Sequence, residues 1–131
     1  MLRDRLVAAG ARLMYLAPTY QNPTGAVMPE LTRQCVAALA DEFGIPVIED
    51  HCLSEMSLEG TPPGPIARYS KAGYSKDGTV LTVGSMSKLF WGGLRVGWIR
   101  GPVAAIAQLA RVKTGADLGS ALITHAIGRN C

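Results

Sequence analysis

Lys88 lies among side chains that together suit a ligand carrying an aldehyde and a phosphate. It follows Ser85 and Ser87 in "GSMSK", and Arg95 comes shortly afterwards. A lysine amine attacks aldehydes when burial or a neighbouring cation lowers its pKa, and Arg95 is the candidate cation. The arginine fork, the two hydroxyls and nearby backbone N–H groups also suit phosphate oxygens. The alternative is a solvated surface loop whose lysine is unreactive.

Two further polar residues stand at or after the ends of apolar runs. Asp50 closes "IPVIED", where a carboxylate needs a partner because an unpaired buried charge is costly. A protonated pyridine nitrogen is one such partner, and a helix cap or structural ion pair is the alternative. Asn22, in "NPTG", suits a hydrogen bond to a phenolic ring oxygen or simply an Asn-Pro turn. Glu49 faces the opposite side of the strand by alternation and is expected to be structural.

Short apolar runs predict the strands that position these residues. They cover 12–18, 45–50, 79–85 and 94–101. The gap before the last strand is too short for a helical crossover, which predicts an antiparallel partner, while the other strands run parallel. The predicted class is α/β, three-layer, with a mostly parallel sheet and one antiparallel strand. Ligands bind beyond the carboxyl ends of such strands, so all the candidate stretches should face one crevice.

Helices are predicted at 28–43 and 102–115. The first rests on apolar side chains four residues apart, with Gly44 as its stop. The Gly- and Pro-rich excursion 54–78 is predicted to hold a short helix near "GPIARYSKAG", and "SALITHAIGRNC" is also predicted to be helical. The sequence predicts that the chain opens almost inside a strand, and two main helices are few for covering both faces of four strands. These features predict a piece of a larger protein.

Composition narrows the function classes. The 131 residues suit one domain, and 48% hydrophobic residues with 18% charged residues indicate a packed core. A net charge of +3 without basic runs argues against a nucleic-acid surface, and no apolar run approaches the length of about 18 residues that a membrane helix needs. Three separated cysteines favour a reduced, cytoplasmic protein. Nothing accompanies His51 and Cys52 with metal-ligand spacing, so no metal is predicted.

The ordered set of motifs is highly specific. "YQNPTG", "VIED" and "GSMSKLFWGGLRVGW" resemble, in order and spacing, the fold-type-I pyridoxal-phosphate enzymes of the aminotransferase class I/II family. Within it, the sequence looks most like the branch of aminoadipate-type aminotransferases and MocR-type regulators. The resemblance covers 1–131 and implies the cofactor-binding half of the family's large domain, without its N-terminal part and the small domain.

The resemblance implies a cofactor, roles and partners. Lys88 would form the internal aldimine with pyridoxal 5'-phosphate and act as the catalytic base. The cofactor would also be bound by Asn22, Asp50, Ser85, Ser87 and Arg95. The implied activity is that of an aminotransferase acting on an amino acid and a 2-oxo acid, as a homodimer in the full-length protein. The branch often has a tyrosine two or three residues after the aspartate, where this sequence has Cys52 and Leu53.

Other interpretations stay open at this point. The chain is alternatively the effector-binding domain of a MocR/GntR-type transcriptional regulator that lacks its winged-helix module. It is alternatively an inactive remnant that keeps the motifs and folds poorly. A nucleotide-binding α/β module is disfavoured, because the sequence has neither GxGxxG nor a P-loop.

Overall fold

The computed structural model describes residues 2–73 and 78–116. Within them the elements follow one another along the chain as helices, strands and two 3₁₀ turns. They are α1 (Leu2–Ala8), β1 (Met14–Leu16), α2 (Glu30–Phe43), β2 (Val47–Asp50), η1 (Ile66–Arg68), β3 (Val80–Ser85), η2 (Gly92–Leu94), β4 (Gly97–Arg100) and α3 (Val103–Ala116).

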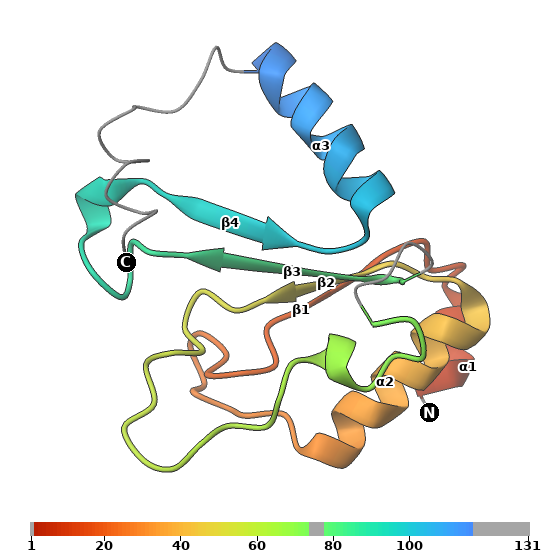
Figure 1. The fold of residues 1–131 in the computed structure, drawn as a ribbon. Helices are drawn as coiled ribbons and strands as arrows, with labels where there is room; N and C mark the ends of the chain where they lie inside the picture. Colours follow the sequence, from red (N-terminus) through yellow and green to blue (C-terminus); the bar gives the residue numbers. More distant parts are fainter. Residues whose placement is uncertain (1, 74–77, 117–131) are drawn as a thin grey trace.

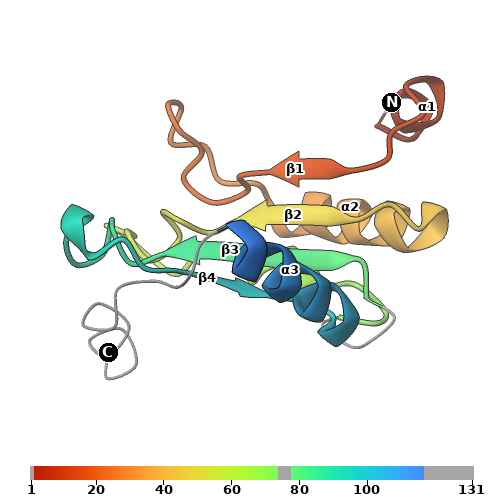
Figure 2. The same ribbon diagram turned by 90° about the horizontal axis from the view of Figure 1, so that it is seen from above.

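The four strands form one sheet in the order β1-β2-β3-β4, as Figure 2 shows. β1, β2 and β3 are parallel, and β4 runs antiparallel to β3. The predicted mostly parallel sheet with one antiparallel strand is therefore confirmed. The loops after β1, β2 and β3 emerge at the same end of the sheet (Figure 1), which brings their residues together.

The two faces of the sheet are covered unequally. α2 and η1 lie on one face and α3 lies on the other side (Figure 1), so helical layers flank the sheet as predicted. Along β3, buried and half-buried positions alternate, and the buried set faces α2 and η1. Within the described part of the chain, no residue of α3 is buried. The core consists of Leu6, Met14, Val36, Ala37, Ala40, Ile45, Val47, Ile66, Ala67 and Val80.

α2 begins and ends close to the predicted positions. Pro29 is its N-cap, and Gly44 ends it in the left-handed region with φ of +61°. The Gly44 N–H donates to the Ala40 carbonyl, which satisfies one of the free carbonyls of the last turn. Glycine suits this position because the left-handed conformation costs it no side-chain clash.

The buried stripe of α2 differs from the apolar stripe in the sequence. Leu31 is 74% exposed and Cys35 is exposed as well. Small alanines face the sheet and allow a close approach, while a fully buried arginine finds hydrogen-bond partners there. The buried residues are Arg33, Val36, Ala37 and Ala40.

The N-terminal segment is a helix. The prediction that the chain opens almost inside its first strand is wrong, because α1 precedes β1. Leu6 is the single buried residue of α1, and Arg3 pairs with Glu42 of α2 at 2.6 Å. So short a helix is stable only through tertiary packing, which the local sequence pattern does not reveal.

The remaining predicted helices have different outcomes. The short helix expected near residues 64–73 is confirmed as η1, and the helix expected at 102–115 is confirmed as α3. The helix predicted in "SALITHAIGRNC", together with His125 and Cys131, lies outside the described residues.

Asp41, near the end of α2, ties that helix to the segment leading into β3. Its carboxylate accepts hydrogen bonds from the Ser70 hydroxyl at 2.8 Å, the Lys71 backbone N–H at 2.7 Å and the Thr79 hydroxyl at 3.2 Å. Asp41→Ala is expected to lower the free energy of unfolding by about 2–3 kcal/mol, because hydrogen bonds to charged groups are lost together. Urea titration measures this.

Glu42→Ala is the matched control for Asp41→Ala. Glu42 makes an exposed ion pair with Arg3 in which both side chains are about half exposed. Its loss is expected to cost less than about 1 kcal/mol. Equal destabilisation by the two substitutions would contradict the role assigned to Asp41.

Candidate functional site

Three of the predicted site residues line one pocket of about 470 Å³. Asn22 comes from the loop after β1, Asp50 from the end of β2, and Lys88 from the turn after β3. The pocket thus lies at the carboxyl ends of the three parallel strands, where open α/β sheets bind ligands. Its size and mixed lining suit a small molecule. The other lining residues are Tyr15, Ala17, Thr19, Tyr20, Gln21, Cys52, Leu53 and Met56.

Asp50 is half-buried, and its two carboxylate oxygens have different donors. The Cys52 backbone N–H donates to Oδ1 at 2.8 Å, and the Tyr15 hydroxyl donates to Oδ2. Burial raises the pKa of Asp50, but the hydrogen bonds from Tyr15 and from the backbone and thiol of Cys52, together with nearby His51, outweigh burial and hold the pKa below its usual value. Asp50 is therefore an anion at neutral pH, and its oxygens keep acceptor capacity for a cationic N–H.

The loop that carries Asn22 is held by the side chain of Gln21. The Gln21 amide oxygen accepts from the Thr24 hydroxyl at 2.5 Å and from the Thr24 N–H at 3.2 Å. Backbone bonds from Gly25 to Gln21 and from Gln21 to Ala26 close the turn. The turn presents the exposed Asn22 at the pocket.

Arg33 of α2 holds the start of the same loop in place. Its guanidinium donates to the Pro18 carbonyl at 2.8 Å and to the Thr19 hydroxyl at 2.9 Å. Arg33 is fully buried. Burial lowers its pKa, whereas the nearby carboxylate of Glu49 raises it. A buried cation on the helix side thus determines where the chain leaves β1.

Lys88 lies in the turn of residues 86–90, which follows β3 directly. The turn is closed by the Phe90 N–H, which donates to the Met86 carbonyl at 3.0 Å. The Lys88 side chain is exposed and borders the same pocket as Asp50. Its amine is accessible to a ligand that occupies the pocket.

The other three predicted residues are not brought into this pocket. Ser85 ends β3, and its hydroxyl accepts from the Ser87 N–H at 3.2 Å. Arg95 is exposed, and its backbone is left-handed with φ of +53°, an uncommon state for a non-glycine residue. None of the three lines the pocket that Lys88 borders.

Cys52 and Leu53 occupy the wall of the pocket beside Asp50. Burial, together with a hydrogen bond to Asp50 and its negative charge, raises the pKa of the Cys52 thiol to about 11. The thiol is therefore protonated at neutral pH and acts as a weak donor rather than as a nucleophile.

We expect Cys52 to alkylate slowly despite lining a pocket. With a pKa of about 11, the thiolate fraction at pH 8 is about one in a thousand. Iodoacetamide at pH 8 should label the exposed Cys35 well before Cys52, as peptide mapping by mass spectrometry would show. In the Asp50→Asn variant Cys52 should react faster, because one cause of its raised pKa is removed. Equal rates for Cys35 and Cys52 would contradict this assignment.

Tyr15 is the residue of the pocket that sequence reasoning missed. It occupies the middle of β1, and its hydroxyl contacts Asp50 across the sheet face. The hydrogen bond to Asp50 raises the pKa of Tyr15. The available signal was a polar-tipped residue within an apolar strand, on the face opposite to the core-facing Met14.

Glu49 is structural, as predicted. It is fully buried, and its two oxygens accept from the Ile66 N–H at 2.9 and 3.0 Å. Its Oε1 also lies 3.8 Å from the Arg33 guanidinium and 3.0 Å from His51 Nε2. The His51 contact has the distance of a hydrogen bond but lacks the alignment of one. Glu49 therefore joins β2 to η1 and α2 on the face opposite to Asp50.

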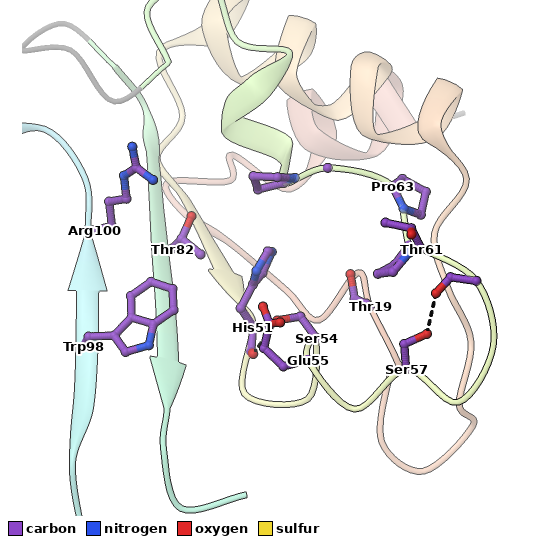
Figure 3. Close-up of a pocket in the computed structure, with 14 residues that line it drawn as sticks. Thr19, His51, Ser54, Glu55, Ser57, Thr61, Pro63, Thr82, Trp98 and Arg100 are labelled. Atoms are coloured by element: carbon purple, nitrogen blue, oxygen red, sulfur yellow. Dashed lines mark hydrogen bonds between the residues drawn. The ribbon is translucent and has the colours of Figure 1, made fainter. Parts of the chain in front are cut away.

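A second pocket of about 430 Å³ opens on that opposite face. Figure 3 shows His51 and Thr82 beside Trp98 and Arg100 of β4, with the loop that carries Ser57, Thr61 and Pro63 across from them. It contains none of the six predicted site residues. The amine, carboxylate and amide that suit the predicted chemistry belong to the first pocket, which we take as the candidate site.

The described residues form neither a metal-binding cluster nor a membrane-spanning helix. No group of three or more His, Cys, Asp or Glu side chains in 2–73 and 78–116 is arranged to hold a metal ion. No helix of the described part is long and apolar enough to cross a membrane.

The polar groups of the pocket fit the ring of pyridoxal phosphate. An ionised carboxylate (Asp50) suits a protonated ring nitrogen, an amide (Asn22) suits the ring hydroxyl oxygen, and an accessible primary amine (Lys88) suits the aldehyde. The pocket lining contains no arginine and neither of the two predicted serines. The residues that line the pocket therefore suit the ring and the aldehyde of the coenzyme.

Known proteins resemble this chain over most of its length. The family model described as "Aminotransferase class I and II" matches residues 7–127. The transcriptional regulator YdfD of Bacillus subtilis, an uncharacterized HTH-type protein, is 35% identical over 90% of this chain and 23% of its own length. Aromatic-amino-acid aminotransferase 1 of Thermococcus litoralis is 32% identical over 82% of this chain and 24% of its own length.

Solved structures give the same result. LysN, an alpha-aminoadipate aminotransferase from Thermus thermophilus, superposes with a TM-score of 0.80 at 31% identity, over 92% of this chain and 32% of that protein. The chain spans about a quarter of the length of the curated relatives that it matches. Because the family model covers nearly the whole sequence and the fold agrees, the chain belongs to the aminotransferase class I and II family.

Proposed function

We propose that this chain binds pyridoxal 5'-phosphate and serves the transfer of an amino group between an amino acid and a 2-oxo acid. The observation that supports the proposal most strongly is the pocket shared by Lys88, Asp50 and Asn22. When bound, the coenzyme supplies an electron sink for bonds at the alpha carbon of the amino acid. We also propose that residues 1–131 form the cofactor-binding half of the large domain of the full-length protein.

Each residue has one task in this proposal. The Asp50 carboxylate would pair with a protonated ring nitrogen of the coenzyme. The Asn22 amide would donate to the ring hydroxyl oxygen. The Lys88 amine would hold the aldehyde and would serve as the general base for a proton at the alpha carbon of the amino acid.

The phosphate is assigned to Ser85, Ser87 and Arg95 on the sequence pattern. These residues follow β3 closely, and hydroxyl and guanidinium groups suit a phosphate. None of them lines the pocket that Lys88 borders.

Covalent labelling tests the proposal. The purified chain is mixed with pyridoxal phosphate, its visible absorbance is recorded, and borohydride then fixes the bound coenzyme before peptide mapping. A visible band with the label at Lys88 is expected, with little label at Lys71, an exposed lysine outside the pocket. Equal labelling of both lysines would refute the proposal.

A second candidate function is the effector-binding domain of a transcriptional regulator. The observation that favours it is the similarity to HTH-type regulators, 35% and 36% identical in the two from Bacillus subtilis. Both candidates use the same pocket and differ in the rest of the protein. Sequencing the gene upstream of Met1 separates them, because a winged-helix module encoded there would favour the regulator.

We further propose that the full-length protein works in the cytoplasm as a homodimer, which the family resemblance implies. Sedimentation of the full-length protein at several concentrations tests the dimer. A single species with the mass of one chain would exclude it.

A further inference from the structure

Tyr15 and Asp50 lie on the same face of the sheet. Tyr15 pairs in register with Ile48, and Asp50 is two residues further along β2, so the two side chains are diagonal neighbours. Met14 points into the core, while Tyr15 is 61% exposed on the other face. A tyrosine is long enough to span a diagonal pair, and its hydroxyl donates to Asp50 Oδ2.

Asp50 accepts hydrogen bonds from three groups that differ in kind, one of which is the Cys52 thiol, a weak donor. The Cys52 N–H belongs to the backbone and holds Oδ1 whatever side chain stands at that position. The Tyr15 hydroxyl is a side-chain donor and holds Oδ2 from the neighbouring strand. Together they stabilise the anion, and the Tyr15 hydroxyl, which approaches from another strand, helps to orient the carboxylate.

We propose that Tyr15 is a positioning residue, whose hydroxyl orients the Asp50 carboxylate and keeps it ionised for the ring nitrogen of the coenzyme. This inference rests on the proposed function, because only a cationic ring partner requires Asp50 to be an oriented anion. Tyr15 acts through Asp50, and it makes no other side-chain hydrogen bond among those described.

A purely structural role for Tyr15 predicts different behaviour. More than half of the side chain is exposed, and the hydroxyl bonds to a half-buried group at the rim of the pocket. Removing the hydroxyl should therefore leave the packing of β1 intact. Tyr15→Phe is expected to stay folded and to lose only the stability of that one hydrogen bond, while the pKa of Asp50 changes.

The first test is made without the coenzyme, on the pH titration of Asp50. Removal of the Tyr15 hydroxyl takes away one of the hydrogen bonds that lower the pKa of Asp50, so this pKa should rise and the titration move to higher pH. Carbon NMR of the labelled carboxyl group follows this directly. The titratable groups around Asp50, which must be assigned in the same experiment, are Tyr15, Tyr20, His51, Cys52 and Lys88.

Tyr20→Phe is the matched control. Tyr20 lines the same pocket as Tyr15, and no hydrogen bond from its hydroxyl to Asp50 is formed among the described residues. Its removal should leave the titration of Asp50 unchanged. Coincident Asp50 titrations in wild type and Tyr15→Phe would overturn the proposal.

The second test measures the affinity for pyridoxal phosphate by absorbance. Tyr15→Phe is expected to bind about tenfold more weakly at neutral pH, since a charge-assisted hydrogen bond is lost. Its binding should also be lost at a higher pH than in the wild type as the solution is acidified. The label fixed by borohydride should still map to Lys88.

The two tests separate the inference from the proposed function. If the wild type takes no label at Lys88, the proposed function fails, and with it the purpose assigned to Tyr15, whatever the titration shows. If the wild type is labelled but Tyr15→Phe keeps wild-type affinity and titration, the proposed function stands and the inference about Tyr15 is wrong.

Discussion

Replacing Lys88 by alanine is expected to abolish the coenzyme label that borohydride fixes in the first pocket. No other amine lines this pocket in the described part of the chain, so no carbon–nitrogen bond to the aldehyde can form there. Transamination, where the full-length protein is assayed, should fall by at least about 10²-fold because the general base is lost as well. Mass spectrometry of the reduced peptides and a coupled assay measure the two effects.

Lys71→Ala controls for the loss of a lysine as such. Lys71 is exposed, and its structural hydrogen bond comes from its backbone N–H, which the substitution keeps. Labelling and activity should therefore match those of the wild type. Persistent labelling of the Lys88→Ala pocket, or equal losses in both variants, would show that the amine of Lys88 has no special role.

The second large effect is expected at Arg33. Its side chain is fully buried and donates to four acceptors from three segments of the chain, lying 3.8 Å from the carboxylate of Glu49. The acceptors are Pro18 O at 2.8 Å, Thr19 Oγ1 at 2.9 Å, Met28 O at 2.9 Å and Gly64 O at 3.2 Å. Arg33→Met should lower the free energy of unfolding by about 3–5 kcal/mol, because these acceptors and a buried carboxylate lose their cation.

Such a loss is a large share of the roughly 5–15 kcal/mol that stabilises a typical domain. Arg3→Met is the matched control, since the same chemical change removes an exposed guanidinium that pairs with Glu42 and lies 5.6 Å from the centre of the Phe43 ring. It should cost less than about 1 kcal/mol. Similar denaturation midpoints for the two variants would contradict the role of Arg33. At temperatures where Arg33→Met is still folded, pyridoxal phosphate should bind less tightly, because the loop that holds Asn22 has lost its anchor.

Much of the fold was predictable because its signals are local. β2 and β3 are apolar runs with clear boundaries, and α2 has a proline at its start and a glycine at its end. The antiparallel direction of β4 followed from the length of the preceding gap. In contrast, α1 is stable only through Leu6 and its contact with α2, and no local pattern predicts such a contact.

The part of the site that was predictable is the part built from residues at the carboxyl ends of the strands. Lys88, Asp50 and Asn22 meet because parallel strands bring their carboxyl ends to one edge. The directions of Ser85 and Ser87 depend on the backbone of the turn after β3, which residue types alone do not determine. Tyr15 was missed because its contact with Asp50 depends on the register between β1 and β2. This register is set by the pairing of the two strands and cannot be read from either strand alone.

The two adjacent acids at the end of β2 make the function of the pocket depend on strand register. Asp50 faces the pocket, and Glu49 faces the buried Arg33 on the other side. A slip of one residue would exchange their faces, exposing the buried acid and burying the other. The hydrogen bonds between Glu49 and the Ile66 N–H oppose that slip. The position of the Asp50 carboxylate in the pocket therefore depends on Glu49, which is buried on the other face of the strand.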